Sequence, residues 1–199
     1  MKLYYANASP YARKVRILIA EKELIEHVEQ QLCNPFDDSP ELIKANPLGK
    51  IPVLITDNGT AFYDSRVICE YLDNLSENTN LIPTSGELHW LVRRWEALAD
   101  GIMDASYNIV MERKRSPDEQ SPQAMERWQT GIMRAIDQAN HDVNRLPSSI
   151  SLAQISLGAA LGYLDFRLPD IDWKSNGEKL AAWYNEFSER ASMKNTRPK

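Results

Sequence analysis

Three short segments within the first 70 residues carry side chains that together could hold and activate a small ligand. The first is Ser9-Pro10, where a short strand candidate ends and a helix begins. The serine hydroxyl and the free N–H groups of the helix start would point to one spot, and an anion such as a thiolate would be stabilised there. An ordinary helix N-cap without chemistry is the alternative interpretation.

The second segment is Asn46-Pro47-Leu48-Gly49-Lys50-Ile51-Pro52-Val53-Leu54, in which a proline stands at the head of an apolar strand. Proline fits there only where its missing N–H costs no ladder bond. If the Ile51–Pro52 peptide bond is cis, the Ile51 N–H and C=O face outward and can pair with an extended, peptide-like ligand. A simple turn from loop to strand would account for the pattern as well.

The third segment is Tyr63-Asp64-Ser65-Arg66, at the start of a helix expected to run to Leu75. Capping of that helix is the plain interpretation. The free backbone donors would also hold a carboxylate, with the Ser65 hydroxyl as an added donor, while Asp64 could accept from an ammonium. A ligand with an amino-acid head would satisfy both groups.

The elements that must position these segments read as strand, helix, strand, helix, two strands and helix. Apolar spacing and turn residues predict strands over 2–6 and 26–32, a helix over 11–23, a short helix from Ser39, a hairpin over 51–63 and a helix over 65–75. Residues 76–86 are rich in Ser, Asn, Thr and Pro and look like a linker. After it, every periodic segment is helical, with helices expected over 87–114, 119–145, 151–163 and 178–191.

Two helical patterns in the second half can be interpreted further. Ser151 and Gln154 fit a capping box that starts a core helix and has no chemistry. Four large side chains fall near one stripe of the helix over 87–114, and some of them are expected to line a pocket while most are core. They are Trp95, Met103, Tyr107 and Met111.

The order of SPYARKVRI, NPLGKIPVL and FYDSRVICEYL, followed by SLAQISLGAALGYLDFR, resembles the glutathione S-transferases over nearly the whole chain. The likeness is to serine-using bacterial and tau-like members. It implies a thioredoxin-like α/β domain over residues 1–75 that binds glutathione, a linker over 76–86 and an all-α helical-bundle domain over 87–199. It further implies a homodimer. Glutathione would be the co-substrate, and its thiolate would attack a small hydrophobic electrophile held between the halves.

Carried over by residue, the resemblance implies that Ser9 hydrogen-bonds the glutathione thiolate and that Ile51 pairs with the cysteinyl backbone. Asp64 and Ser65 would hold the γ-glutamyl end, and Lys50 would face the glycine carboxylate. Tau-like members have a second basic residue before the short helix, whereas this chain has Asp38 there. Glutathione affinity is therefore expected to be modest.

Three alternatives remain at this point. Tyr5 could replace Ser9 as the donor to the thiolate. Strand alternation, however, places the Tyr5 side chain on the same face as Leu3, and Ser9 has the better position at the helix end. A redox enzyme could use Cys33, but no partner cysteine lies nearby. The third alternative is a non-catalytic protein that keeps this fold for protein contacts, as stringent-starvation regulators do.

Composition argues against several other functions. The formal charge of −5 gives no basic footprint for nucleic acid, and no apolar run approaches the length that spans a bilayer. The start of the chain does not resemble a signal peptide, so a cytoplasmic location is expected. The three histidines have no metal-ligand spacing, and two distant cysteines predict neither a disulfide framework nor a metal site. No cofactor is expected, and glutathione is expected as a co-substrate.

Overall fold

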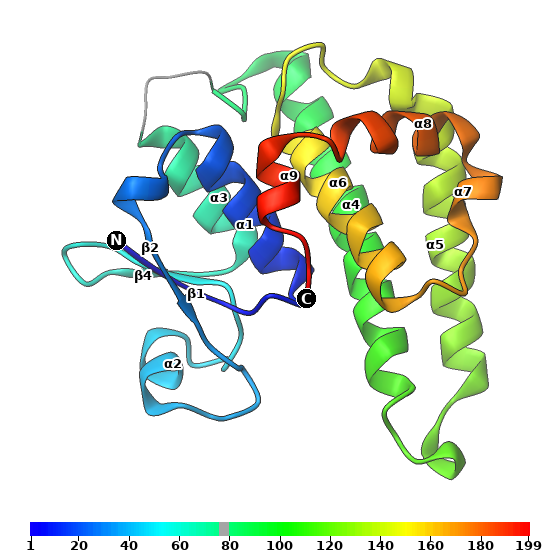
Figure 1. Ribbon diagram of the computed structural model, residues 1–199, viewed down its shortest axis with the longest axis horizontal. Helices are drawn as coiled ribbons and strands as arrows, with labels where there is room; N and C mark the ends of the chain where they lie inside the picture. The colour runs from blue at the N-terminus through cyan, green and yellow to red at the C-terminus, as the bar shows by residue number, and fades with distance from the viewer. Residues whose placement is uncertain (76–79) are drawn as a thin grey trace.

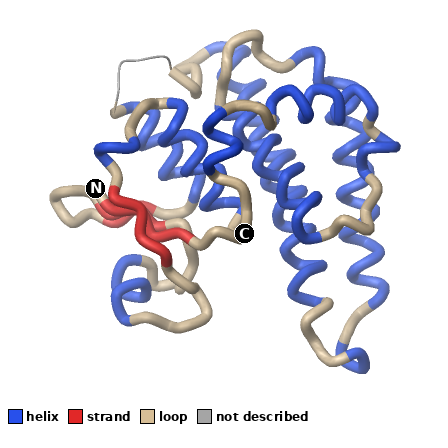
Figure 2. The backbone as a smooth tube through the Cα atoms, in the orientation of Figure 1, coloured by secondary structure: helices blue, strands red, loops and turns tan. Residues whose placement is uncertain are grey.

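The computed structural model describes residues 1–75 and 80–199, which form a small sheet-containing part followed by a helical part (Figures 1 and 2). The first part contains β1 (Lys2–Tyr5), α1 (Pro10–Glu21), β2 (Glu29–Leu32), α2 (Pro40–Ala45), β3 (Val53–Ile55), β4 (Ala61–Phe62) and α3 (Ser65–Asn74). The second contains α4 (Gly86–Glu112), α5 (Pro122–Asp142), α6 (Leu152–Arg167), α7 (Trp173–Asn176), α8 (Glu178–Phe187) and α9 (Ala191–Asn195). The predicted fold class is confirmed.

The four strands form one mixed sheet in the order β2, β1, β3, β4. Strand β1 pairs parallel with β2 and antiparallel with β3, so that Leu3 lies opposite both Gln30 and Leu54. Helices α1 and α3 cover one face of the sheet and α2 covers the other (Figure 1). Alternation along β1 follows this arrangement, because Leu3 belongs to the main core and Tyr4 to the small core under α2.

The helical part packs around α6, which is apolar almost all round because it lies in the centre of the core. Its start is the predicted capping box: Ser151 N donates to Gln154 Oε1 at 3.0 Å, and the Ser151 hydroxyl accepts from the backbone in return. The main core continues from the sheet through α1 into α4 and α6. The two halves therefore share one buried interior.

Several predicted boundaries differ from those in the structure. The strand expected over 26–32 begins only at Glu29, because Ile25–His27 form a 3₁₀ turn. The helix expected from residue 119 begins at Pro122, where the Ser121 hydroxyl caps it by accepting from Ala124 N.

The predicted ends of helices in the C-terminal part also differ from the structure by a few residues. Helix α6 runs four residues beyond the predicted end, and the helix expected over 178–191 ends at Phe187. The short helices α7 and α9 were not predicted, because four or five residues are too few for a periodic signal. Residues 76–79 of the predicted linker lie outside the described part of the chain, and the proposed division at 75 and 87 stays a prediction.

Candidate active site

A cavity of about 770 Å³ lies between the N-terminal half and helices α4 and α6. Its lining includes all five residues predicted to form the site: Ser9, Lys50, Ile51, Asp64 and Ser65. They come from the loops that join β1 to α1, α2 to β3 and β4 to α3. Three segments that are far apart in the sequence thus meet at one cavity.

Ser9 is the N-cap of α1, and its hydroxyl oxygen accepts from Ala12 N at 3.2 Å. Pro10 occupies the first helical position, where its fixed φ suits the helix and no backbone donor is lost. The capping and chemical interpretations are compatible, because a hydroxyl that accepts a hydrogen bond still has its own hydrogen to donate. The half-buried Ser9 side chain can therefore present a donor to the cavity beside the positive end of α1.

Tyr5 does not line this cavity. Its ring packs against the main core on the same face as Leu3, and the Arg16 guanidinium lies 4.3 Å from the ring centre. The presence of Ser9 and the absence of Tyr5 in the cavity lining support Ser9 over Tyr5 as the donor at this site.

The loop before β3 is built around the buried side chain of Asn46. Its Nδ2 donates to the Lys50 carbonyl at 2.8 Å and its Oδ1 accepts from Leu48 N at 3.0 Å. Gly49, with φ of +62°, makes the turn that this loop needs. The sequence motif contained Asn46, but its role in shaping the loop was missed.

The Ile51–Pro52 peptide bond is cis. Among the described residues, no group forms a hydrogen bond with the Ile51 N–H or C=O. These two groups are consequently available to an extended ligand in the cavity. The neighbouring Lys50 side chain is exposed and has no acidic partner within the described part of the chain.

Asp64 caps α3, with Oδ1 accepting from Arg66 N at 3.0 Å, and the preceding Tyr63–Asp64 peptide bond is cis. The second carboxylate oxygen of the exposed Asp64 is left without a described partner. Ser65 is buried, lines the cavity, and its hydroxyl forms no hydrogen bond with a described residue. An acceptor and a donor for an amino-acid head therefore stand side by side at a helix N-terminus.

A buried ion network that sequence reasoning missed lies behind α3 and fixes its first turn. Lys14 Nζ of α1 lies 2.8 Å from Asp100 Oδ1 and 3.2 Å from Glu96 Oε1, both on α4. The other Asp100 oxygen accepts from Arg66 Nε at 2.6 Å. Glu96 and Asp100 stand one turn apart between the apolar residues of a helix, and that was the available signal. The network ties Asp64 and Ser65 to the helical half.

Comparisons with known proteins identify the family of this chain. Family models described as the glutathione S-transferase N-terminal and C-terminal domains match residues 3–80 and 122–186. A glutathione transferase family member from Pseudomonas fluorescens Pf-5, solved with bound glutathione, is 42% identical; the match covers 100% of this chain and 98% of that one, with a TM-score of 0.96. The chain belongs to the glutathione S-transferase family.

A second structure of the same Pseudomonas fluorescens target and one further relative extend the comparison. A Pseudomonas fluorescens Pf-5 family member was also solved with bound S-(propanoic acid)-glutathione, and it is 42% identical over 100% of both chains with a TM-score of 0.92. An uncharacterised GST-like protein of Escherichia coli K12, YibF, is 33% identical over 100% of this chain and 98% of its own.

The second wall of the cavity comes from α4 and α6. Of the stripe predicted on α4, Trp95 and Met103 are core residues, while Tyr107 and Met111 line the cavity. Tyr11 also lines it and donates a very short hydrogen bond to Asp104. Burial, together with the Asp104 carboxylate, raises the pKa of Tyr11 far above its usual value. Tyr11 is thus held as a neutral phenol.

Neither cysteine has the environment of a reactive thiolate. Cys33 follows β2, where burial and the nearby Asp37 and Glu41 charges raise the pKa of its thiol. Cys69 is fully buried in α3, and burial raises the pKa of its thiol strongly. No group of three His, Cys, Asp or Glu residues in the described ranges could hold a metal ion. No helix within them is long and apolar enough to cross a bilayer.

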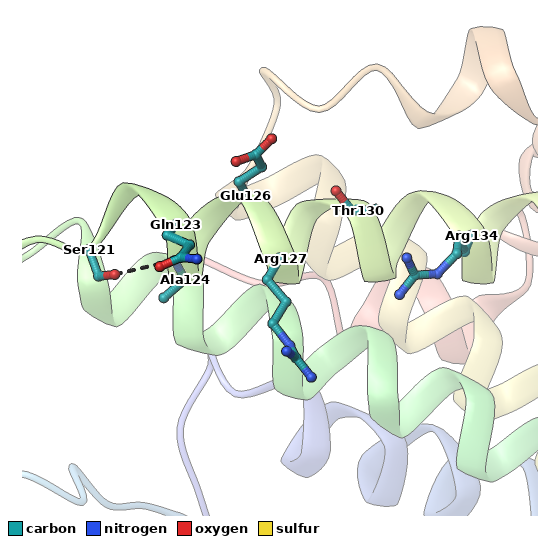
Figure 3. Close-up of a pocket in the computed structure, with 7 residues that line it drawn as sticks. All are labelled: Ser121, Gln123, Ala124, Glu126, Arg127, Thr130 and Arg134. Carbon is teal, nitrogen blue, oxygen red and sulfur yellow. Dashed lines mark hydrogen bonds between the residues drawn. The ribbon is translucent and has the colours of Figure 1, made fainter.

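A second hollow lies on α5, away from these loops (Figure 3). All of its lining residues lie between Ser121 and Arg134, on a single helix and its cap. Glu126 and Arg127 extend to opposite sides of the helix in Figure 3, and none of the residues predicted for the site is present. The cavity between the halves, and not this hollow, is therefore the candidate active site.

Proposed function

We propose that this chain is a glutathione transferase that binds glutathione along the edge of the sheet and activates its thiol at Ser9. The observation that carries the proposal is the convergence of Ser9, Ile51 and the Asp64–Ser65 pair on one cavity, each with a free hydrogen-bonding group. An interaction protein would have no need to combine an anion site with an amino-acid site.

In this proposal the tripeptide extends from Asp64 to Lys50. The γ-glutamyl ammonium is held by Asp64 and its carboxylate by the Ser65 hydroxyl and the N–H groups that start α3. The cysteinyl backbone pairs with Ile51, and the glycine carboxylate faces Lys50. The thiol then lies at Ser9, where the hydroxyl hydrogen and the positive end of α1 stabilise the thiolate that forms when its proton leaves to solvent.

The thiolate would then attack an electrophile held against α4 and α6. The cavity continues from the Ser9 loop past Tyr107, Met111 and Phe36, so a largely apolar molecule has room beside the sulfur. Binding of S-(propanoic acid)-glutathione by a relative supports a site that admits a group on that sulfur. Proximity of the two reactants, together with stabilisation of the thiolate, supplies the catalysis.

We also propose that the transferase acts as a homodimer in the cytoplasm. Exposed apolar side chains on α3 and at the start of α4 support the dimer: Val67 is 45% exposed and Trp90 is 70% exposed. A neighbouring subunit that covers them would remove this surface from water. Sedimentation of the purified protein measures its mass directly.

The test is calorimetric titration of glutathione into the wild type and into the Asp64→Ala and Ser9→Ala variants, together with turnover of a general chromogenic electrophile. We expect Asp64→Ala to abolish binding, and Ser9→Ala to abolish turnover while binding remains. Asp172→Ala is the matched control for Asp64, because Asp172 caps the distant helix α7. Absence of binding to the wild type at millimolar glutathione would contradict the proposal and favour a non-catalytic interaction protein.

A further inference from the structure

Two cations line the cavity in addition to the residues that the proposal assigns to glutathione. Arg167 stands in the last turn of α6 and Lys114 follows the end of α4. Among the described residues neither has a carboxylate partner, and each lies only against an aromatic ring. Arg167 Cζ is 4.4 Å from the centre of the Phe166 ring, and Lys114 Nζ is 5.7 Å from that of Phe36.

Arg113, the neighbour of Lys114, differs from these two cations because it has a carboxylate partner. Arg113 donates to both carboxylate oxygens of Asp170, at 3.0 and 2.7 Å, and it does not line the cavity. Arg167 and Lys114 therefore leave two positive charges unneutralised beside an open volume.

A phenol stands next to Arg167 and is also without a partner. Tyr163, one turn earlier on α6, is only 4% exposed, lines the cavity, and forms no hydrogen bond with a described residue. Burial raises the pKa of Tyr163, while the nearby Arg167 charge opposes that rise. At ordinary pH, Tyr163 is thus a neutral donor beside a guanidinium.

The acidic residues of the cavity lining are Asp64 and Asp104. Asp64 stands at the start of α3, and Asp104 accepts from Tyr11, close to the Ser9 loop. Helices α4 and α6 lie side by side and run in the same direction (Figure 1). From Asp104, helix α4 rises about 12 Å to its last residue, Glu112, and Lys114 follows two residues later. A second anion is favoured near Arg167 and Lys114, which have no carboxylate partner among the described residues.

We propose that the electrophile carries a carboxylate, which Arg167 binds through paired hydrogen bonds with Tyr163 as a further donor. A planar guanidinium matches a carboxylate in this way, and Lys114 adds a point charge. The apolar body of the molecule lies against Tyr107, Met111 and Phe36. This inference rests on the proposed transferase function and restricts its substrates to acidic electrophiles.

A matched pair of aromatic electrophiles tests the proposal: 4-chloro-3-nitrobenzoate and its methyl ester. In both, the thiolate sulfur forms a bond to the ring carbon that bears chlorine, and chloride leaves with the electron pair of the broken bond. Chlorine and nitro group occupy the same ring positions in both, and the carboxylate of one is replaced by an uncharged methyl ester in the other. Rates are divided by the uncatalysed rate with glutathione, because the two rings differ in intrinsic reactivity.

For the wild type we expect this ratio to be at least about 10-fold higher for the acid than for the ester, as charge-assisted hydrogen bonds predict. Arg167→Gln should lower kcat/KM for the acid by about 10-fold or more and change that for the ester by less than about twofold. For Arg167→Lys, kcat/KM for the acid should lie between the values for the wild type and for Arg167→Gln. Lysine keeps the positive charge but cannot form the paired hydrogen bonds of a guanidinium. Arg113→Gln is the control and should change neither.

Affinity for the two product thioethers, measured by calorimetry, supplies a readout that does not need turnover. We expect tighter binding of the acid thioether to the wild type and loss of that preference in Arg167→Gln. Equal treatment of acid and ester by the wild type, or equal losses on both in Arg167→Gln, would overturn the inference while glutathione transfer to the ester stands. No turnover of either electrophile and no binding of either thioether would remove the proposed function and this inference together.

Discussion

The Lys14 ammonium of α1 lies 2.8 Å from the Asp100 carboxylate of α4, and both groups are buried. Burial alone would lower the pKa of Lys14, but the nearby Asp100 and Glu96 carboxylates outweigh it and raise that pKa. Asp100 also accepts from Arg66 at the start of α3. The Asp100 carboxylate thus joins α1, α3 and α4, and each of these three helices contributes residues to the cavity of the candidate site.

Removal of the Lys14 charge should therefore be costly. Lys14→Met leaves two carboxylates buried without their ammonium, and we expect a loss of about 3 to 5 kcal/mol in the free energy of unfolding. Urea denaturation measures it. The control is Arg113→Gln, which breaks an exposed pair with Asp170 and should cost at most about 1 kcal/mol. Similar losses for the two variants would show that the buried network contributes no more than a surface pair.

Ser9 should have two separable roles. Ser9→Ala removes the acceptor for Ala12 N, and we expect a loss of about 1 kcal/mol in stability, as for other N-caps. It should also raise the pKa of the bound glutathione thiol and reduce turnover, because the hydroxyl donor to the thiolate is lost. The thiolate absorbance of bound glutathione, followed against pH, measures that pKa.

Ser121→Ala is the matched control, since Ser121 caps the remote helix α5 in the same way. It should cost a similar amount of stability and leave turnover unchanged. If Ser9→Ala has no effect on the thiol pKa, Ser9 is only a cap and another group activates the thiol.

The sequence predicted the loops of the site well because each contains a local signal. Ser9-Pro10 and Asp64-Ser65 mark helix starts, and the proline at 52 marks the head of a strand. Local chemistry at such positions depends little on the rest of the fold. The structure accordingly brings all five predicted residues to one cavity.

Residues that act through tertiary contacts could not be predicted in this way. Lys14 reads as a solvent-facing residue in sequence, and only the approach of α4 explains its burial. Arg167 reads as a favourable charge at a helix C-terminus, and its position on the cavity wall depends on how α6 packs. The burial of Lys14 and the position of Arg167 both depend on how the helices pack against one another. The periodicity of a single sequence does not contain this information.

Docking of the C-terminal helix α9 should depend on pH through Glu21. Burial would raise the pKa of Glu21, but hydrogen bonds from Arg190 and Ser192 lower it below the ordinary 4.5. A lowered carboxyl pKa contributes stability that is fully present above the unfolded-state value and is lost as pH falls through the folded-state value. We expect this contribution to disappear below pH 4.5.

Urea denaturation of the wild type and Glu21→Gln between neutral pH and about pH 3 measures this linkage. The variant should be less stable than the wild type at neutral pH, and the difference should shrink on acidification. A difference that is constant with pH would show that Glu21 acts through packing and not through its charge.

Close packing of α6 against α8 should make Gly158 intolerant of a side chain. A Cβ there would lie 2.7 Å from Cε1 of the Phe187 ring, which is too close for the rigid ring to accommodate without movement. We expect Gly158→Ala to destabilise the protein by about 1 to 3 kcal/mol. Gly131→Ala on α5 is the matched control, because nothing lies within 4 Å of its Cβ position. Helix propensity alone predicts a gain of about 0.5 to 1 kcal/mol there. Opposite signs in urea denaturation would confirm the packing, whereas a gain at both positions would show that α8 moves away from α6 at little cost.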